Sequence, residues 1–394
     1  MAITLAQVAA AGGNISLAAE QQGIPRPTMQ ARYREASTLL PNNLPDDPIH
    51  IVSDLKAKLK AAAANQLSED RVRDAIIGLK QAPLDVPQWS LAPPSKGRTL
   101  GIPMTIWSDW HFGEVVFPSQ VNGVNEFDLA IAHKRVRLLV DRTVDLLLNH
   151  MVNPNYPGIV VCLGGDLVSG GIHDELAQTD AAPIMPIVVD VYGVLIWALT
   201  ELAKKFSRVW VVGVSGNHGR NTKKIWAKHR NYTNFDWLVC QMLAKHFETD
   251  KRISFYIPDG PDAHVKVFDY SYLLTHGDRL GRGGDGMIGS VGPIHRGTLR
   301  KQARDSQIAQ PFDTLIHGHF HTLSQTQRII GNGSLIGYNE YAYTEGFMFE
   351  IPQQAIWIHH PERGITWQTG VHLVDKRAAM KGVFGSESVQ YGRM

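Results

Sequence analysis

Five short polar motifs, each following an apolar stretch of strand-like sequence, contain side chains of the kinds that bind metal ions. In a layered α/β protein the loops at the carboxyl ends of strands converge on one crevice, so five such loops can meet at a single site. Carboxylates, imidazoles and one amide suit borderline divalent ions such as Mn, Fe, Zn or Co, and two ions about 3.5 to 4 Å apart need one shared carboxylate. The sequence therefore predicts a metal site. Its motifs are Asp109-Trp110-His111, Gly165-Asp166, Gly216-Asn217-His218, Thr275-His276-Gly277 and Gly318-His319-Phe320-His321.

Taken in this order, the motifs resemble the pattern of the calcineurin-like metallophosphoesterase superfamily, which runs D-x-H, G-D, G-N-H, H and G-H-x-H. The resemblance covers about residues 103–337 and includes all five motifs. It implies an α/β fold, a layered β-sandwich flanked by helices in an αββα arrangement, with two metal ions bridged by Asp166. The ligands that it implies are Asp109, His111, Asp166 and His321 for one ion, and Asp166, Asn217, His276 and His319 for the other.

The same resemblance implies a reaction. A water held between two dications has its pKa lowered from ~15.7 toward ~7, so a hydroxide is available to attack phosphorus in line with the departing oxygen. His218 would lie beside the scissile phosphate and protonate the leaving oxygen as a general acid. In much of the superfamily an acidic residue follows this histidine, but here Gly219 follows it. Either another carboxylate or carbonyl holds the ring, or the acid role is weakened. We expect Mn²⁺ as the metal, with Fe, Zn, Co and Ni as alternatives.

Basic residues follow two of the motifs and bear on the substrate. The segment GRNTKKIWAKHRNY after His218 mixes cations with aromatic rings, and a second basic segment runs from His276 to residue 304. Lysines and arginines along a groove bind backbone phosphates, and aromatic rings stack on exposed bases. The alternative is that these charges are solvated helix faces. The predicted phosphate or substrate contacts are Arg220, Lys223, Lys224 and His173, with Glu175 as a further polar residue of the crevice.

The first forty residues are similar to a Fis-type helix-turn-helix. In NISLAAEQQGIPRPTMQARYREA, a short helix with paired alanines precedes the turn at Gly23, and a basic helix follows. The alternative is a small helical hairpin used for protein contact, because acidic residues oppose the basic ones. The residues expected to contact DNA are Arg26, Thr28, Gln30 and Arg32.

Three functions follow from these features. The leading hypothesis is a Mn-dependent DNA nuclease, with a catalytic domain resembling repair exonucleases of the SbcD type and a domain arrangement more like phage or prophage proteins. The second is a phosphatase or phosphodiesterase acting on small nucleotides or phosphoproteins. The third is a DNA-binding regulator that uses the phosphoesterase domain as a scaffold; the presence of all seven implied ligands argues against it.

Length and composition set the organisation. The 394 residues, 44% of them hydrophobic and 19% charged, favour more than one folded unit. We expect a helix-turn-helix domain over 1–40, a linker and connector helix over 41–97, a metallophosphoesterase domain over 98–375 and a tail over 376–394. From about residue 98, strand-like runs alternate with long helices, the sign of a layered α/β sheet.

Charge and cysteine content bear on partners and location. A net charge of +2 makes any nucleic-acid contact a matter of local patches. Two cysteines and the absence of a basic segment leading into an apolar core predict a cytoplasmic protein, in a bacterium or in the host of a phage. The apolar stretch 183–202 carries Asp190 and is expected to be a buried helix rather than a membrane span. We expect DNA as a partner and no association with a membrane. The sequence leaves open whether the chain forms a homo-oligomer.

Overall fold

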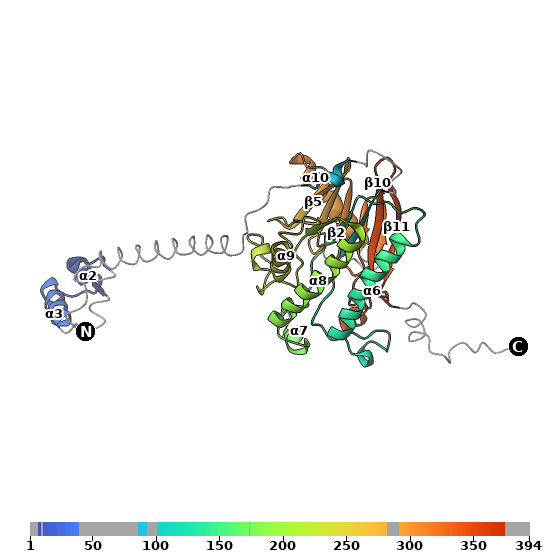
Figure 1. Ribbon diagram of the computed structural model, residues 1–394. Helices are drawn as coiled ribbons and strands as arrows, with labels where there is room; N and C mark the ends of the chain where they lie inside the picture. The colour runs from blue at the N-terminus through green and yellow to red at the C-terminus, as the bar shows by residue number, and fades with distance from the viewer. Residues whose placement is uncertain are drawn as a thin grey trace. The chain divides into compact units, whose positions relative to one another are not determined.

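The computed structural model describes residues 7–8, 11–38, 86–92, 101–172, 174–281 and 291–374. The chain divides into two compact units, Met1–Ile76 and Ile77–Met394, and each is described by itself. The predicted connector helix within 41–85 and the predicted tail over 376–394 lie outside the described residues. Figure 1 shows the elements of both units.

The described residues of the N-terminal unit include helices α2 (Ile15–Gln21) and α3 (Arg26–Thr38), which a short turn joins. Asn14 caps α2, because its side chain accepts from the backbone N–H groups of Ser16 and Leu17. Gly23 follows α2 with a φ of +64°, a conformation that suits glycine. A small apolar core holds the helices together, and its buried members are Val8, Ala11, Ala18, Ala19 and Met29.

The larger unit is built on two sheets. The first sheet has the order β11-β10-β1-β2-β3-β4, in which β1 to β4 are parallel and β10 and β11 antiparallel. Its strands are β1 (Ile102–Trp107), β2 (Ile159–Leu163), β3 (Val209–Gly213), β4 (Ile253–Tyr256), β10 (Gln353–His360) and β11 (Gly364–His372). The second sheet has the mixed order β5-β6-β7-β9-β8. Its strands are β5 (Asp262–Val267), β6 (Tyr270–Thr275), β7 (Thr314–His317), β8 (Ser324–Gln325) and β9 (Ile329–Gly331).

Helices cover the outer faces of both sheets. The main helices are α6 (Leu129–Leu148), α8 (Ile184–Phe206), α9 (Phe235–His246) and α10 (Val291–Gln307) (Figure 1). Shorter helices are α5 (Gln88–Leu91), α7 (Asp174–Thr179), α11 (Glu340–Thr344) and the 3₁₀ turns at Pro118–Gln120 and Asn231–Thr233. The described helix α5 falls within the proline-rich segment that precedes the main domain.

Three buried clusters show how the layers stack. Side chains of both sheets, such as Ile106 of β1 and Leu274 of β6, share the cluster between them. The outer face of the first sheet packs on α6, α8 and α9, and the outer face of the second packs on α10. The order helices, sheet, sheet, helices confirms the layered α/β class expected from the sequence.

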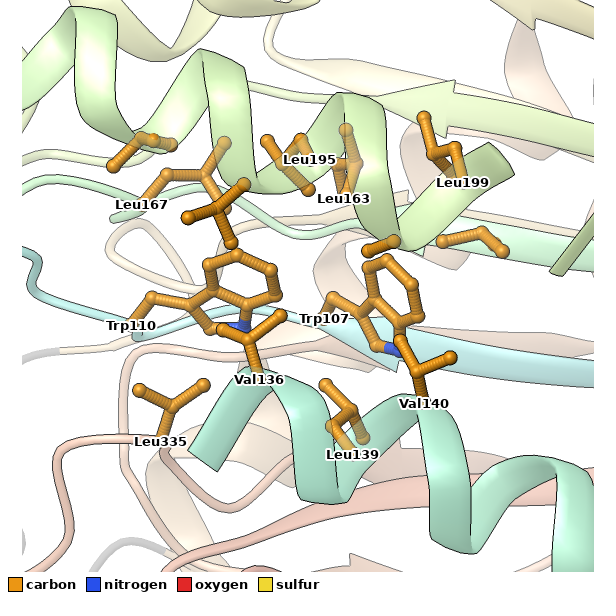
Figure 2. Close-up of a cluster of buried hydrophobic side chains, with 14 of the residues drawn as sticks. Trp107, Trp110, Val136, Leu139, Val140, Leu163, Leu167, Leu195, Leu199 and Leu335 are labelled. Atoms are coloured by element: carbon orange, nitrogen blue, oxygen red, sulfur yellow. The ribbon is translucent and has the colours of Figure 1, made fainter. Parts of the chain in front are cut away.

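Two tryptophans fill the layer between the first sheet and its helices. Figure 2 shows the rings of Trp107 and Trp110 between side chains of α6, including Leu139, and side chains of α8, including Leu195. Both tryptophans are fully buried. Replacing a buried ring of this size by alanine costs about 3 to 5 kcal/mol. The strand end that carries the first motif is thus fixed by a large part of the core.

Helix α8 carries the most apolar sequence of the described helices and by length and composition alone could cross a membrane. Its buried residues, such as Leu195 and Leu199, face the first sheet within the main core cluster. A core helix passes the same test of length and composition. Only 39% of the apolar window is buried, and Met185 and Val189 are exposed, so α8 is buried on one face only and its assignment as a core helix stays a prediction.

A partly buried ion pair joins the second sheet to α10. Lys301 Nζ lies 2.7 Å from Asp262 Oδ1, and Arg304 lies 2.9 Å from Asp262 Oδ2. Burial alone would raise the pKa of Asp262, but Lys301 and Arg304 outweigh burial and hold it below its usual value. This carboxylate therefore favours the folded state in its ionised form.

Asp262→Asn is expected to lower the free energy of unfolding at pH 7 by about 2 kcal/mol, because it leaves the partly buried Lys301 ammonium without its charged partner. Because the folded pKa of Asp262 lies below the unfolded value of about 3.9, its contribution is complete above that pH and is lost as the pH falls through the folded pKa. Urea unfolding at pH 7 and below pH 4 measures this, and the difference between wild type and variant should shrink at the lower pH. An equal difference at both would contradict it.

Candidate metal centre

All five motifs lie in loops at the carboxyl ends of strands and meet at one edge of the two sheets. The first three follow β1, β2 and β3, and the last two follow β6 and β7. The pairs β1–β2, β2–β3 and β6–β7 are parallel, which brings these ends to the same side. Three overlapping groups have ligand atoms within 4.8 Å of one another: Asp109, His111 and His321; His111, Asp166 and His218; Asp166, His276 and His319.

Asp166 lies at the middle of this arrangement. Its Oδ2 is 3.0 Å from His276 Nε2, and its Oδ1 accepts a hydrogen bond of 2.6 Å from the backbone N–H of His218. Asn217 Oδ1 is also 3.0 Å from His276 Nε2. The structure thus brings Asn217, the only amide among the predicted ligands, to the same histidine as the central carboxylate.

Asp109 is held by several partners at the other side. Its Oδ1 accepts from the backbone N–H of His319 at 2.9 Å and lies 3.4 Å from His321 Nε2. Its Oδ2 accepts from Ser108 Oγ at 2.5 Å, and Asn332 donates to the same hydroxyl. The carboxylate therefore links the loop after β1 to the loop after β7.

Left-handed backbone conformations are concentrated at these residues. Such a conformation costs a residue other than glycine on the order of 1 to 3 kcal/mol, and it persists where the surrounding structure fixes it. Backbone hydrogen bonds from Asp109 to Gly165 and from His111 to Asp166 supply part of that constraint. Five of the seven predicted ligands have φ between +49° and +71°, namely Asp109, His111, Asp166, His319 and His321.

The charges of the centre are mutually stabilising. Burial alone would raise the pKa of Asp166, but His276, His218 and His111 outweigh it and hold that pKa well below its usual range. Burial alone would lower the pKa of His276, yet Asp166 raises it to about 10. The described protein therefore has buried carboxylates and histidines whose charges compensate one another, and a metal ion would have to displace the proton of His276.

The donor set fits divalent metal ions. His111 Nδ1 lies 3.2 Å from Glu114 Oε2, and neither of the two buried ring nitrogens of His111 makes a hydrogen bond within the part of the chain that is described. A ring nitrogen left without a partner at a cluster of carboxylates suits metal coordination, with the other nitrogen held by a second group. The oxygens and imidazoles of the three groups can hold divalent metal ions.

Glu114 was missed by the sequence analysis. It is buried, contacts His111, and accepts from Asn339 Nδ2 at 2.8 Å. Burial alone would raise the pKa of Glu114, but His111 outweighs it, so the pKa is lowered. The sequence feature that could have indicated Glu114 is its position three residues after the predicted ligand His111.

Glu114→Gln is expected to weaken Mn²⁺ binding by about 10-fold or more, because His111 loses the carboxylate that orients its ring. Isothermal titration of the metal-stripped protein with Mn²⁺ measures the change. Glu345→Gln, a substitution of an exposed glutamate after α11, serves as the control and should leave the affinity as it is. Equal affinities for wild type and Glu114→Gln would refute a role in orienting the ring.

The ring of His218 is held by a carbonyl. Its Nδ1 lies 2.9 Å from the backbone oxygen of Ser169. This carbonyl orients the ring, in place of the acidic side chain that Gly219 lacks. Burial lowers the pKa of His218 to about 4, against the opposite effect of Asp166. The ring is therefore neutral at pH 7, with Nδ1 as the donor to Ser169.

The residues predicted to contact phosphate lie in different environments. Arg220 donates to the backbone oxygens of Asn217 at 2.6 Å and Thr222 at 3.0 Å, so it braces the loop that carries Asn217. Lys223 and Lys224 are exposed, and so is Glu175 on α7, whereas His173 lies outside the described residues. A small hollow beside Asn217 is lined by Arg220, Ile225, Trp226 and Arg230, among others.

Several cations of the two basic segments already have acidic partners. Arg230 lies 2.9 Å from Asp278, and Lys301 and Arg304 pair with Asp262. In the N-terminal unit Arg26, Thr28 and Arg32 are exposed and Gln30 is half-buried. The sequence shows the positions of the charges but not these partners.

Comparisons with known proteins give distant likenesses. No protein-family model matches the chain, and no curated protein matches it. The chain is similar to the sulfate thiohydrolase SoxB of Thermus thermophilus in complex with glycerol, at 9% identity and a TM-score of 0.30, over 74% of this chain and 60% of that one. It is also similar to the protein of unknown function AQ665 from Aquifex aeolicus, at 14% identity and a TM-score of 0.24, over 58% of this chain and 89% of that one.

A third likeness is to a protein of Staphylococcus aureus assigned as a 5'-nucleotidase, in complex with α-ketoglutarate. The identity is 11% and the TM-score 0.28, over 70% of this chain and 55% of that one. This chain thus spans less than two thirds of the length of the first and third of these proteins. Since all three TM-scores are 0.30 or lower, the function of this chain has to be argued from its own residues.

Proposed function

We propose that this chain is a metal-dependent phosphoesterase of the calcineurin-like superfamily that hydrolyses phosphodiester bonds in DNA. The observation that carries the proposal is Asp166, whose carboxylate belongs to two of the three groups of potential ligands. A shared carboxylate between two sets of histidines is the arrangement that a pair of divalent ions requires. We take the pair to be Mn²⁺.

Each predicted residue has a part in this scheme. One ion would take Asp109, His111, Asp166 and His321, and the other Asp166, Asn217, His276 and His319. Metal ions held there would acidify a water molecule and offset negative charge on the phosphate. His218 is neutral in the described structure. Close to an anionic phosphate it would bind a proton and then donate that proton to the leaving oxygen, while the carbonyl of Ser169 orients the ring.

Exposed cations support DNA as the substrate. Lys223 and Lys224 lie in the segment that follows His218, and half-exposed Trp226 offers a ring on which a base could stack. In the N-terminal unit, Arg26, Thr28 and Arg32 are exposed on α3, as a DNA-reading helix requires. Cytoplasmic location is part of the same proposal, and the buried free thiols of Cys162 and Cys240 agree with it.

One observation favours a second candidate, a phosphatase or phosphodiesterase for small nucleotides. The ion pairs of Arg230 with Asp278 and of Lys301 with Asp262 neutralise part of the basic segments that DNA would need. A small phosphate ester needs only the metal centre and a few neighbouring groups.

Digestion of labelled single- and double-stranded DNA with Mn²⁺ tests the proposal, with His218→Ala as the matched variant. Cleavage by wild type well above that variant supports nuclease activity. If DNA stays intact while a chromogenic phosphate monoester turns over far faster than its bis-ester, the small-substrate candidate holds instead. Metal analysis giving less than one ion per chain, with no hydrolysis of any substrate, would refute both.

A further inference from the structure

A buried carboxylate outside the five motifs, Asp236, contacts the loops that carry two of the predicted ligands. Its Oδ2 accepts from the backbone N–H of Asp166 at 2.9 Å and from that of Gly216 at 2.9 Å. Its Oδ1 accepts from the N–H of Leu167 at 3.0 Å. One side chain thus joins the loop after β2, which contains Asp166, to the loop after β3, which contains Asn217.

The start of α9 fixes this carboxylate in place. Asn234 caps the helix, because its Oδ1 accepts from the N–H of Asp236 at 2.8 Å. The Nδ2 of Asn234 donates to Gly216 O at 2.9 Å, and the N–H of Phe235 donates to Gly219 O at 2.7 Å. The first turn of α9 is therefore bound to both ends of the segment that contains Asn217 and His218.

Gly219 leaves the space that this arrangement needs. A Cβ atom at Gly219 would lie 2.6 Å from Asn234 Oδ1 and 3.0 Å from Asp236 Cγ. Both distances are shorter than the usual contact of such atoms. A side chain at the position after His218 would therefore overlap Asn234 and crowd the carboxylate of Asp236.

We propose that Asp236 is a positioning residue that sets the separation of Asp166 and Asn217 by binding the two loops that carry them. The proposal rests on the proposed metal-dependent function. Hydrogen bonds from backbone N–H groups to a carboxylate are short and strong, and three of them converge here at a side chain with no solvent exposure. A ligand pair held at the wrong separation binds its metal less tightly.

Mn²⁺ alone, titrated into the metal-stripped full-length protein, tests this proposal through affinity and through the EPR spectrum of the bound ions. Asp236→Asn keeps the shape of the side chain and removes its charge. The matched control is Asp305→Asn, the same change at an equally buried carboxylate on α10 that pairs with Arg304. Thermal unfolding of both variants separates loss of stability from loss of metal binding. We expect Asp236→Asn to bind Mn²⁺ about 10- to 100-fold more weakly and Asp305→Asn to bind it as wild type does.

Two results would overturn the positioning role. One is wild-type Mn²⁺ affinity in Asp236→Asn. The other is an equal loss of affinity in both variants, because it would reflect general destabilisation. Should Asp236→Asn fail to fold, Asp236→Glu is the second variant, because it keeps the charge on a side chain that is longer by one methylene group. Wild-type Mn²⁺ affinity and an unchanged EPR spectrum in Asp236→Glu would also overturn the positioning role. Failure of wild type itself to bind Mn²⁺ would instead overturn the proposed function.

Discussion

Replacing Asp166 by asparagine is expected to lower kcat/KM for phosphodiester hydrolysis by at least about 1,000-fold, equivalent to about 4 kcal/mol of transition-state stabilisation. The substitution keeps the size of the side chain but removes the charge that two groups of histidines share. The amide also offers a single oxygen where the carboxylate offers two, so it cannot serve both groups. Metal content should fall with activity.

The measurement combines metal analysis of the purified variant with turnover of a chromogenic phosphodiester in Mn²⁺. Asp190→Asn is the control, since Asp190 lies on α8, is partly exposed, pairs with His133 and belongs to none of the groups of potential ligands. It should retain full metal content and activity. An Asp166→Asn protein with two ions per chain and more than about a tenth of the wild-type rate, a loss of less than about 1.4 kcal/mol, would disprove the central role of this carboxylate.

The second large effect is expected from Gly216→Ala. A Cβ atom at this position would overlap the Oδ1 atom and the backbone nitrogen of Asp166. The carboxylate must move, and overpacking of this kind costs about 1 to 3 kcal/mol in stability besides the loss of ligand geometry. We expect activity to fall by about 100-fold or more, roughly 3 kcal/mol of transition-state stabilisation.

Gly193→Ala gives a matched comparison for Gly216→Ala. Gly193 lies within α8, and a Cβ there would meet nothing within 4 Å. Because alanine favours a helix interior by up to about 1 kcal/mol over glycine, this variant should be as stable as wild type or more stable, with unchanged activity. Thermal unfolding and turnover of the two variants side by side test the argument, which fails if Gly216→Ala retains wild-type turnover.

The layered fold could be predicted from the sequence because it depends on local patterns. Residues of the five motifs lie together in the structure, while their role as metal ligands stays a prediction. Apolar runs that alternate with long helices predicted the layered class. The motifs that follow five strand-like runs predicted which loops lie together. The partners of those residues follow from the tertiary structure instead. Asp236 lies 70 residues after Asp166 in no motif, and Ser169 acts through its backbone oxygen, which no side-chain pattern records.

Charge is where sequence alone was least informative. Runs of lysine and arginine suggest a surface for polyanions, but only folding reveals that Asp262 and Asp278 neutralise Lys301 and Arg230. Lys223, Lys224, Lys228 and Arg296 are members of these runs that are exposed. A pattern of charges along a chain therefore gives an upper bound on the basic surface of the folded protein.

The two buried cysteines make the protein a convenient object for chemical labelling. Burial raises the pKa of the thiols of Cys162, to about 12, and Cys240, and neither is in contact with solvent. Since the thiolate is the reactive form, maleimide reagents should leave the native chain unmodified. A single cysteine introduced at exposed Arg32 or Lys224 would then carry one fluorophore or spin label. Distances from such labels to bound Mn²⁺ would report the arrangement of the N-terminal unit and the metal centre in solution.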